Sequence, residues 1–152
     1  MNNLAKRPFE IFNSLNLTRV ENMVISRRAR RLGKPSVGGS DAHSLEMLGM
    51  TSNHMDAQDM DSALKSIEHG DVRVEGRYVP VSVVVGWTRK RMRLSHADIR
   101  RYIEKNYSFP RAGVARFLLE RFVSSESGVW NGLGSFAVGV SAVYSTLRIS
   151  VR

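Results

Sequence analysis

Asp41 and His43 are the residues whose types and spacing indicate chemistry, because they stand two positions apart in a glycine-rich stretch. A carboxylate is a hard oxygen ligand and an imidazole is a nitrogen ligand, and together they suit zinc, manganese or iron. The spacing is also compatible with a solvated turn, in which Asp41 accepts a backbone N–H and His43 is simply exposed. The elements on either side bear on the choice between these two interpretations.

These elements predict that both residues follow a buried strand. Gly-Lys-Pro over residues 33–35 is a helix stop, since glycine takes the left-handed cap and proline cannot continue a helix. Residues 35–38 predict a short strand, and the glycine pair that follows its valine releases it into a tight turn. A strand over residues 9–12 is expected to lie beside it in parallel. Asp41 and His43 would then lie just past the carboxyl end of a strand, where α/β folds place their chemistry.

Residues 38–43, Gly-Gly-Ser-Asp-Ala-His, followed by Leu48-Gly49, resemble the last motif of the PHP (polymerase and histidinol phosphatase) family. Phe-Glu-Ile-Phe-Asn over residues 9–13 resembles the strand ending in Asn that precedes this motif. Residues 62–77 resemble the closing helix and strand of the family. The resemblance covers roughly residues 8–80, about half of the chain.

The resemblance implies a distorted (β/α)7 barrel in which a cluster of two or three metals activates water against a phosphate ester. The aspartate and histidine of this motif are metal ligands in the family, which makes Asp41 and His43 the expected ligands for manganese, zinc or iron. The family begins with a His-x-His motif and adds further His and Glu ligands. This chain has four histidines and no His-x-His. Most of the metal site is therefore missing, and the chain alone is expected to be inactive.

Length leads to the same expectation, because a (β/α) barrel needs about 250 residues and this chain has 152. We expect an α/β fold: a partial, incomplete PHP-type barrel over residues 1–80 and a basic, mainly helical C-terminal extension over residues 81–152. Such a piece would be a natural truncation, a split subunit or the product of a mis-assigned start. Its open strand edges would favour self-association or pairing with a missing N-terminal half. Besides the strands over residues 9–12 and 35–38, we expect helices over residues 19–32 and 59–69 and strands over residues 50–54 and 72–75. Together these elements make about three βα-like units.

Caps and spacing support these helices. Thr18 and Glu21 have the pattern of a capping box, and Asp59 is the expected N-cap of the second helix, which Gly70 ends. Apolar residues at spacings of three and four predict one buried stripe on each helix. The expected buried side chains are Ile25, Ala29 and Leu32 in the first helix and Met60, Ala63, Leu64 and Ile67 in the second.

The other histidines and the arginines of the first helix carry weaker signals. His54 could face the site from a neighbouring strand end, His69 suits the dipole at a helix end, and His96 is expected to be exposed in a capping turn. The arginine run at residues 27, 28, 30 and 31 is typical of a solvated helix face. The alternative is that it recruits phosphate to the loop that follows.

Composition excludes some classes of protein. The absence of cysteine excludes disulfides and thiolate metal sites. The first seven residues have no apolar run behind their charges, which predicts no signal peptide and favours a cytoplasmic location, with membrane association as the alternative. The net charge of +9 favours polyanionic partners, namely phosphorylated substrates, nucleic acid or anionic lipid.

The C-terminal part contributes much of this charge. A basic cluster over residues 87–93 precedes a predicted helical appendage over residues 95–147, which Ser-Phe-Pro at residues 108–110 interrupts. Nucleic acid is the weaker partner, because no known binding motif occurs and the aromatic residues fall on apolar helix faces.

Residues 127–147 contain no charged side chain and are long enough to span a bilayer, which takes about 20 residues. Their serines and glycines make the stretch only weakly hydrophobic. We therefore expect a helix that buries one apolar stripe against protein, with membrane contact as the alternative. The stripe consists of Val129, Leu133, Phe136, Val140, Val143 and Leu147.

Three functions from different classes follow. The chain is the C-terminal portion of a metal-dependent phosphoesterase, or a non-catalytic remnant or interaction domain, or a basic module that binds nucleic acid or an anionic membrane. The sequence does not identify the substrate or the metal.

Overall fold

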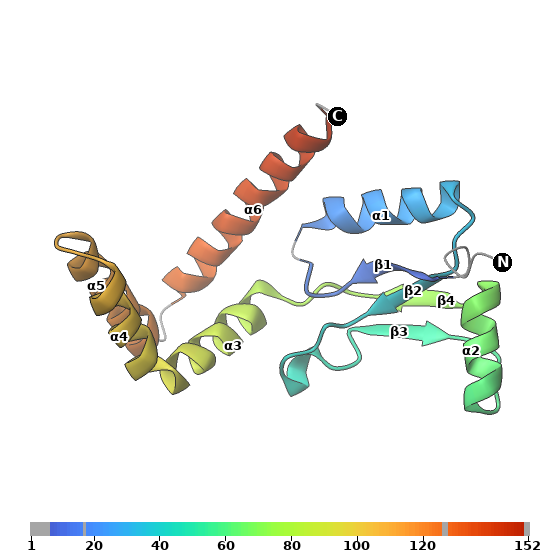
Figure 1. The fold of residues 1–152 in the computed structure, drawn as a ribbon, viewed down its shortest axis with the longest axis horizontal. Helices are drawn as coiled ribbons and strands as arrows, with labels where there is room; N and C mark the ends of the chain where they lie inside the picture. Colours follow the sequence, from blue (N-terminus) through green and yellow to red (C-terminus); the bar gives the residue numbers. More distant parts are fainter. Residues whose placement is uncertain (1–6, 17, 126–127, 151–152) are drawn as a thin grey trace. The chain divides into compact units, whose positions relative to one another are not determined.

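The computed structural model describes residues 7–16, 18–125 and 128–150. These residues form a mixed α/β structure with small sheets and no closed barrel among them (Figure 1). The chain forms two compact units. The first comprises residues 1–79 and 137–152, and the second comprises residues 80–136.

The predicted parallel pair is confirmed. β1 (Phe9–Asn13) pairs in parallel with β2 (Ser36–Gly39), and α1 (Arg19–Arg31) connects them. The prediction that the glycine pair forms a turn is wrong, since both glycines belong to β2. A Cβ atom at Gly38 would lie 2.5 Å from Val74 and 2.6 Å from Thr51, so only glycine allows this approach.

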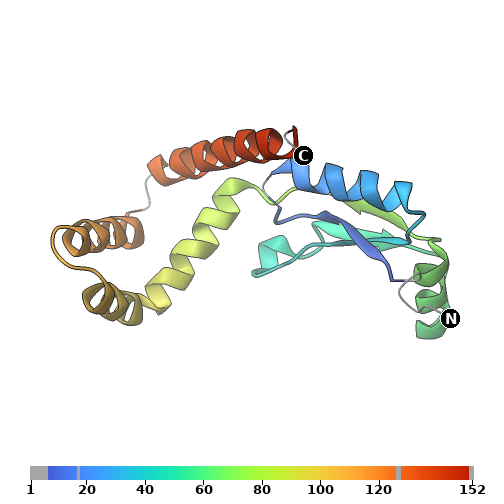
Figure 2. The same cartoon turned by 45° about the horizontal axis from the view of Figure 1, so that its top comes forward.

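The second small sheet differs from the expected βα units. β3 (Thr51–His54) and β4 (Arg73–Gly76) are strands as predicted, but they pair antiparallel although α2 (Met60–His69) lies between them in the chain (Figure 2). The Asn53 side chain links this sheet to β2, since its amide accepts from the Gly38 N–H at 2.8 Å and donates to the Gly38 carbonyl at 2.9 Å. The Asn53 side chain therefore makes the two hydrogen bonds to Gly38 that the backbone of a neighbouring strand would otherwise make.

The prediction of a buried apolar stripe on α1 is largely wrong. Ala29 is fully buried, but Ile25 is 37% and Leu32 is 53% exposed. The capping box is also not formed, because the Thr18 hydroxyl donates to the Glu21 carboxylate at 3.0 Å and makes no hydrogen bond to a helix N–H. The helix ends as expected, with Gly33 at φ +57°.

Both ends of α2 are confirmed. Asp59 accepts from the Ser62 N–H at 2.7 Å, and Gly70 ends the helix at φ +84°. Two of its expected inward side chains are exposed, namely Met60 and Leu64.

The second unit is helical, as expected for this part of the chain. α3 (Val81–Leu94) begins earlier than the predicted appendage and includes the basic cluster, and it is followed by α4 (His96–Asn106), α5 (Arg111–Ser124) and the start of α6 (Val129–Ser150). Ile103 of α4 and Leu119 of α5 are buried. His96 was expected to be exposed in a turn, but it begins α4, is partly covered and lies 2.9 Å from the Glu120 carboxylate.

This chain does not itself bury the α6 stripe. Its six apolar residues from Val129 to Leu147 are between 52% and 71% exposed. Within the described parts of the chain, no helix is long and apolar enough to cross a bilayer.

Candidate metal-ligand loop

The loop that carries Asp41 and His43 follows β2 directly, at the end of the strand where Asn13 closes the neighbouring β1. Asp41 has a φ of +47°, which a short polar side chain tolerates better than most residues. Both side chains are about half exposed, at 50% for Asp41 and 43% for His43. They therefore do not point into a packed core.

A local hydrogen bond sets the tautomer of His43. Its Nδ1 atom lies 2.7 Å from the Asp41 backbone carbonyl. A carbonyl oxygen only accepts, so Nδ1 carries the proton of the neutral ring and Nε2 carries the lone pair. Histidine ligands of metals commonly have this arrangement, with the non-ligating nitrogen bonded to a carbonyl or carboxylate.

Asn13 connects the loop to β1. Its side-chain amide donates to Glu10 at 3.2 Å and reaches the Asp41 carboxylate at 3.5 Å. The Glu10 carboxylate also lies against the α-carbon of Gly39, where a Cβ atom would collide with it. Two carboxylates and an amide thus lie together at this edge of the sheet.

The sequence did not indicate Glu10 as part of this cluster. Residues three apart on a regular strand point to opposite faces, so Glu10 and Asn13 would be separated. The register with β2 shifts between Glu10 and Phe12, and such an irregularity changes the side-chain alternation. A bulge of this kind has no signature in the five-residue strand sequence.

Met47 anchors the far side of the loop. It is fully buried, and its sulfur lies 3.5 Å from the His43 backbone nitrogen, which donates to it. The neighbouring Leu45 and Leu48 are exposed. The loop is therefore held by contacts of its own and needs no ion to define it.

A metal centre requires more ligands than this loop provides. Among the residues that the structure describes, no group of three or more His, Cys, Asp or Glu side chains could hold a metal ion. Asp41 and His43 have suitable donor atoms, but catalytic zinc usually takes three protein ligands and a water.

His54 belongs to a separate cluster. Its Nε2 atom lies 3.1 Å from the Ser52 hydroxyl and 3.2 Å from the Glu75 carboxylate. A catalytic triad needs the serine and the acid on opposite ring nitrogens, so this cluster is not one. Hydrogen bonding and charge attraction from Arg73 lower the pKa of Glu75, with a smaller contribution from His54.

The position of β3 also separates His54 from the loop. Thr51, at the start of β3, hydrogen-bonds through its hydroxyl to Ser14, which directly follows β1. The strand runs away from this edge of the sheet, and His54 is its last residue. The structure does not bring His54 to Asp41.

The arginines of α1 are exposed, as a solvated face predicts. They occupy the last turns of the helix, just before Gly33 and the start of β2. Asp41 follows the opposite end of that strand. His69 ends α2 and lies with Glu68 along a polar pocket beside Pro35, again at the start of β2.

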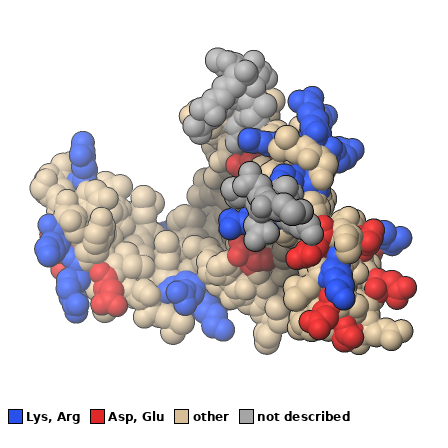
Figure 3. Space-filling view, turned by 45° about the vertical axis from the view of Figure 1, so that its right-hand side comes forward, with Lys and Arg blue, Asp and Glu red and all other residues tan. Residues whose placement is uncertain are grey.

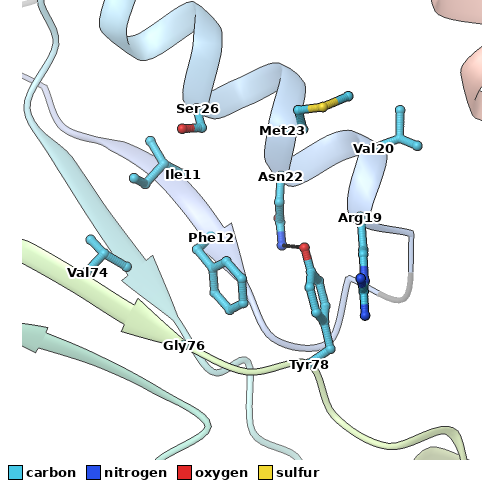
Figure 4. Close-up of a pocket in the computed structure, with 10 residues that line it drawn as sticks. All are labelled: Ile11, Phe12, Arg19, Val20, Asn22, Met23, Ser26, Val74, Gly76 and Tyr78. Atoms are coloured by element: carbon cyan, nitrogen blue, oxygen red, sulfur yellow. Dashed lines mark hydrogen bonds between the residues drawn. The ribbon is translucent and has the colours of Figure 1, made fainter.

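A pocket of about 500 Å³ lies between α1 and β1 (Figure 4). Asn22 is buried at its wall and makes a pair of hydrogen bonds with Asn13, accepting from its N–H at 3.2 Å and donating to its carbonyl at 3.0 Å. Asn22 also donates to the Tyr78 hydroxyl at 3.3 Å, and the Arg19 guanidinium lies over the Tyr78 ring at 5.5 Å. Asn22 thereby fixes the end of β1 from which Asn13 reaches Asp41.

Comparison with protein families gives a match over part of the chain. Residues 20–72 match a family model described as PHP-associated. The matched segment runs from α1 to just before β4 and contains the Asp41–His43 loop. This confirms the family relationship that the motif predicted, and it is consistent with the C-terminal part of a PHP-family protein. No curated protein matches the chain, and no solved structure matches it.

Proposed function

We propose that this chain, with its PHP-associated segment over residues 20–72, supplies the last two metal ligands of a PHP-type metal-dependent phosphoesterase. The observation that carries the proposal is the position of Asp41 and His43 inside that segment, at the end of a parallel strand pair. In this proposal residues 1–80 are part of an incomplete barrel.

The donor chemistry fits a divalent ion such as manganese, zinc or iron. Asp41 would bind through its carboxylate and His43 through Nε2, because Nδ1 is engaged by the Asp41 carbonyl. Asn13 would hold the carboxylate in place. A bound metal cluster would lower the pKa of its water and neutralise charge on the phosphoryl oxygens.

Residues from outside this chain would have to complete the cluster. Two ligands do not fix a catalytic ion, so the chain alone should show no metal-dependent turnover. An open strand edge offers a place for a missing N-terminal half, or for a second copy, to join the sheet.

Two experiments test this. The DNA upstream of the Met1 codon should encode an in-frame segment with a His-x-His motif, or a neighbouring gene should encode it. The purified chain should not hydrolyse a generic phosphomonoester with added Mn²⁺ or Zn²⁺, whereas addition of the missing half should give turnover that the Asp41→Ala/His43→Ala variant loses. If the chain alone turns over substrate and this variant does not, the fragment proposal is wrong. If the completed protein is inactive, the loop is a non-catalytic remnant.

A further inference from the structure

The helical second unit has an apolar groove of about 520 Å³, a volume within the range of small-molecule sites. Leu118 and Leu133 line it and are 50% and 52% exposed, so the groove is open to solvent. Its walls come from α3, α4, α5 and the start of α6, and include Val85, Ile103 and Trp130.

Arg89 places a cation beside this apolar wall, although it is not itself one of the lining residues. It follows Val85 by four residues and precedes Met92 by three, and both of these line the groove, so the three residues share one face of α3. Its guanidinium lies 5.5 Å from the ring centre of Phe122, another groove residue. Phe122 in turn packs edge-on against Trp130 at 5.0 Å.

The guanidinium has an unsatisfied donor. The Nε atom of Arg89 is buried and has no hydrogen-bond partner among the described residues. Buried donors in native proteins almost always have an acceptor. A planar guanidinium is suited to a carboxylate, which can accept two parallel hydrogen bonds from it.

The charge of the unit also favours an anionic occupant. Residues 80–136 contain ten Lys and Arg and four Asp and Glu, a net charge of +6. Basic side chains are spread over the visible face of this unit, with few acidic ones among them (Figure 3).

We propose that the groove binds a long-chain carboxylate, with its hydrocarbon tail against the apolar walls and its carboxylate on the Arg89 guanidinium. A cation beside an apolar groove matches a ligand with an anionic head and an apolar chain. The occupant is a free fatty acid that enters as a monomer.

The test uses the full chain and palmitate below its aggregation concentration. Trp130 lines the groove, so its fluorescence reports binding, and calorimetry gives the stoichiometry. We expect one palmitate per chain, with affinity about tenfold lower in Arg89→Gln and partly restored in Arg89→Lys. Hexadecanol, which has the same tail without the charge, should bind more weakly than palmitate. Its affinity should be the same for Arg89→Gln as for the unmodified chain.

Arg101→Gln is the matched control, because it removes the same charge from an exposed side chain of α4 that pairs with Asp98. It should bind palmitate like the unmodified chain, and circular dichroism should show equal helix content in every variant. Equal loss in both glutamine variants, or equal affinity for palmitate and hexadecanol, would overturn the proposal. Binding to phosphatidylglycerol vesicles without binding to monomeric palmitate would also overturn it, in favour of a membrane-docking surface.

Discussion

Replacing Asn22 by alanine tests whether this buried amide holds the end of β1. Asn22 is 7% exposed, and it bonds the N–H and the carbonyl of Asn13 at 3.2 and 3.0 Å and the Tyr78 hydroxyl at 3.3 Å. A hydrogen bond contributes about 1 kcal/mol net, and a buried group left without its partner costs about 1–3 kcal/mol. We therefore expect Asn22→Ala to lower the free energy of unfolding of the first unit by about 2–4 kcal/mol.

Urea denaturation measures this loss. With a slope of about 1–1.5 kcal/mol per molar urea for a unit of this size, the midpoint should fall by at least about 1.3 M. Both tryptophans, Trp87 and Trp130, lie in the second unit, so their fluorescence should follow that unit while circular dichroism follows both units. The circular dichroism transition should shift, and the tryptophan transition should shift less.

Asn106→Ala is the matched control, because Asn106 is exposed and donates to the Tyr102 carbonyl within its own helix. It should leave the first unit unchanged. A midpoint for Asn22→Ala within about 0.3 M of the unmodified chain, or an equal fall in the control, would refute the reasoning about Asn22.

Three further predictions concern stability. Gly38→Ala should destabilise by about 1–3 kcal/mol because its Cβ would overpack the sheets, whereas Gly86→Ala, in a helix with open space around it, should stabilise by about 0.5–1 kcal/mol; thermal unfolding separates the two signs. Met47→Ala should cost about 2–5 kcal/mol, because the side chain is fully buried, and equal melting of this variant and the unmodified chain would contradict that packing. Hydrogen bonds from the Ser62 hydroxyl and N–H lower the pKa of Asp59, so this cap stabilises the fold at neutral pH and the contribution is lost as the pH falls through the lowered pKa. The stability difference between the unmodified chain and Asp59→Asn should accordingly shrink in acid, and a constant difference would contradict it.

The sequence predicted the strands and helices of the first unit because their ends carry strong local signals. Gly33 and Gly70 take left-handed backbone angles that few other residues adopt, and Asp59 caps a helix through its own side chain. Such signals act within a few residues. The parallel pairing of β1 and β2 followed from the helix between them.

Burial was predicted poorly because it depends on partners that periodicity does not specify. The spacing of Ile25, Ala29 and Leu32 gives α1 an apolar face, but of these three the structure buries Ala29 alone, and it buries the polar Asn22 as well. The apolar stripe of α6 has regular spacing and is still exposed. A stripe shows which side of a helix is apolar, whereas the element that covers it must come from another part of the chain or from another molecule.

The candidate loop shows the same division between local and distant determinants. The Asp41 carbonyl contacts the His43 ring, the Asn13 amide reaches the Asp41 carboxylate, and the buried Met47 accepts from the His43 backbone N–H, so all three contacts lie within this chain. If Asp41 and His43 bind a metal as proposed, these contacts would reduce the reorganisation that binding requires. The further ligands that the proposed metal site requires are not set by these local contacts, so the motif locates the candidate loop without determining whether a complete site forms around it.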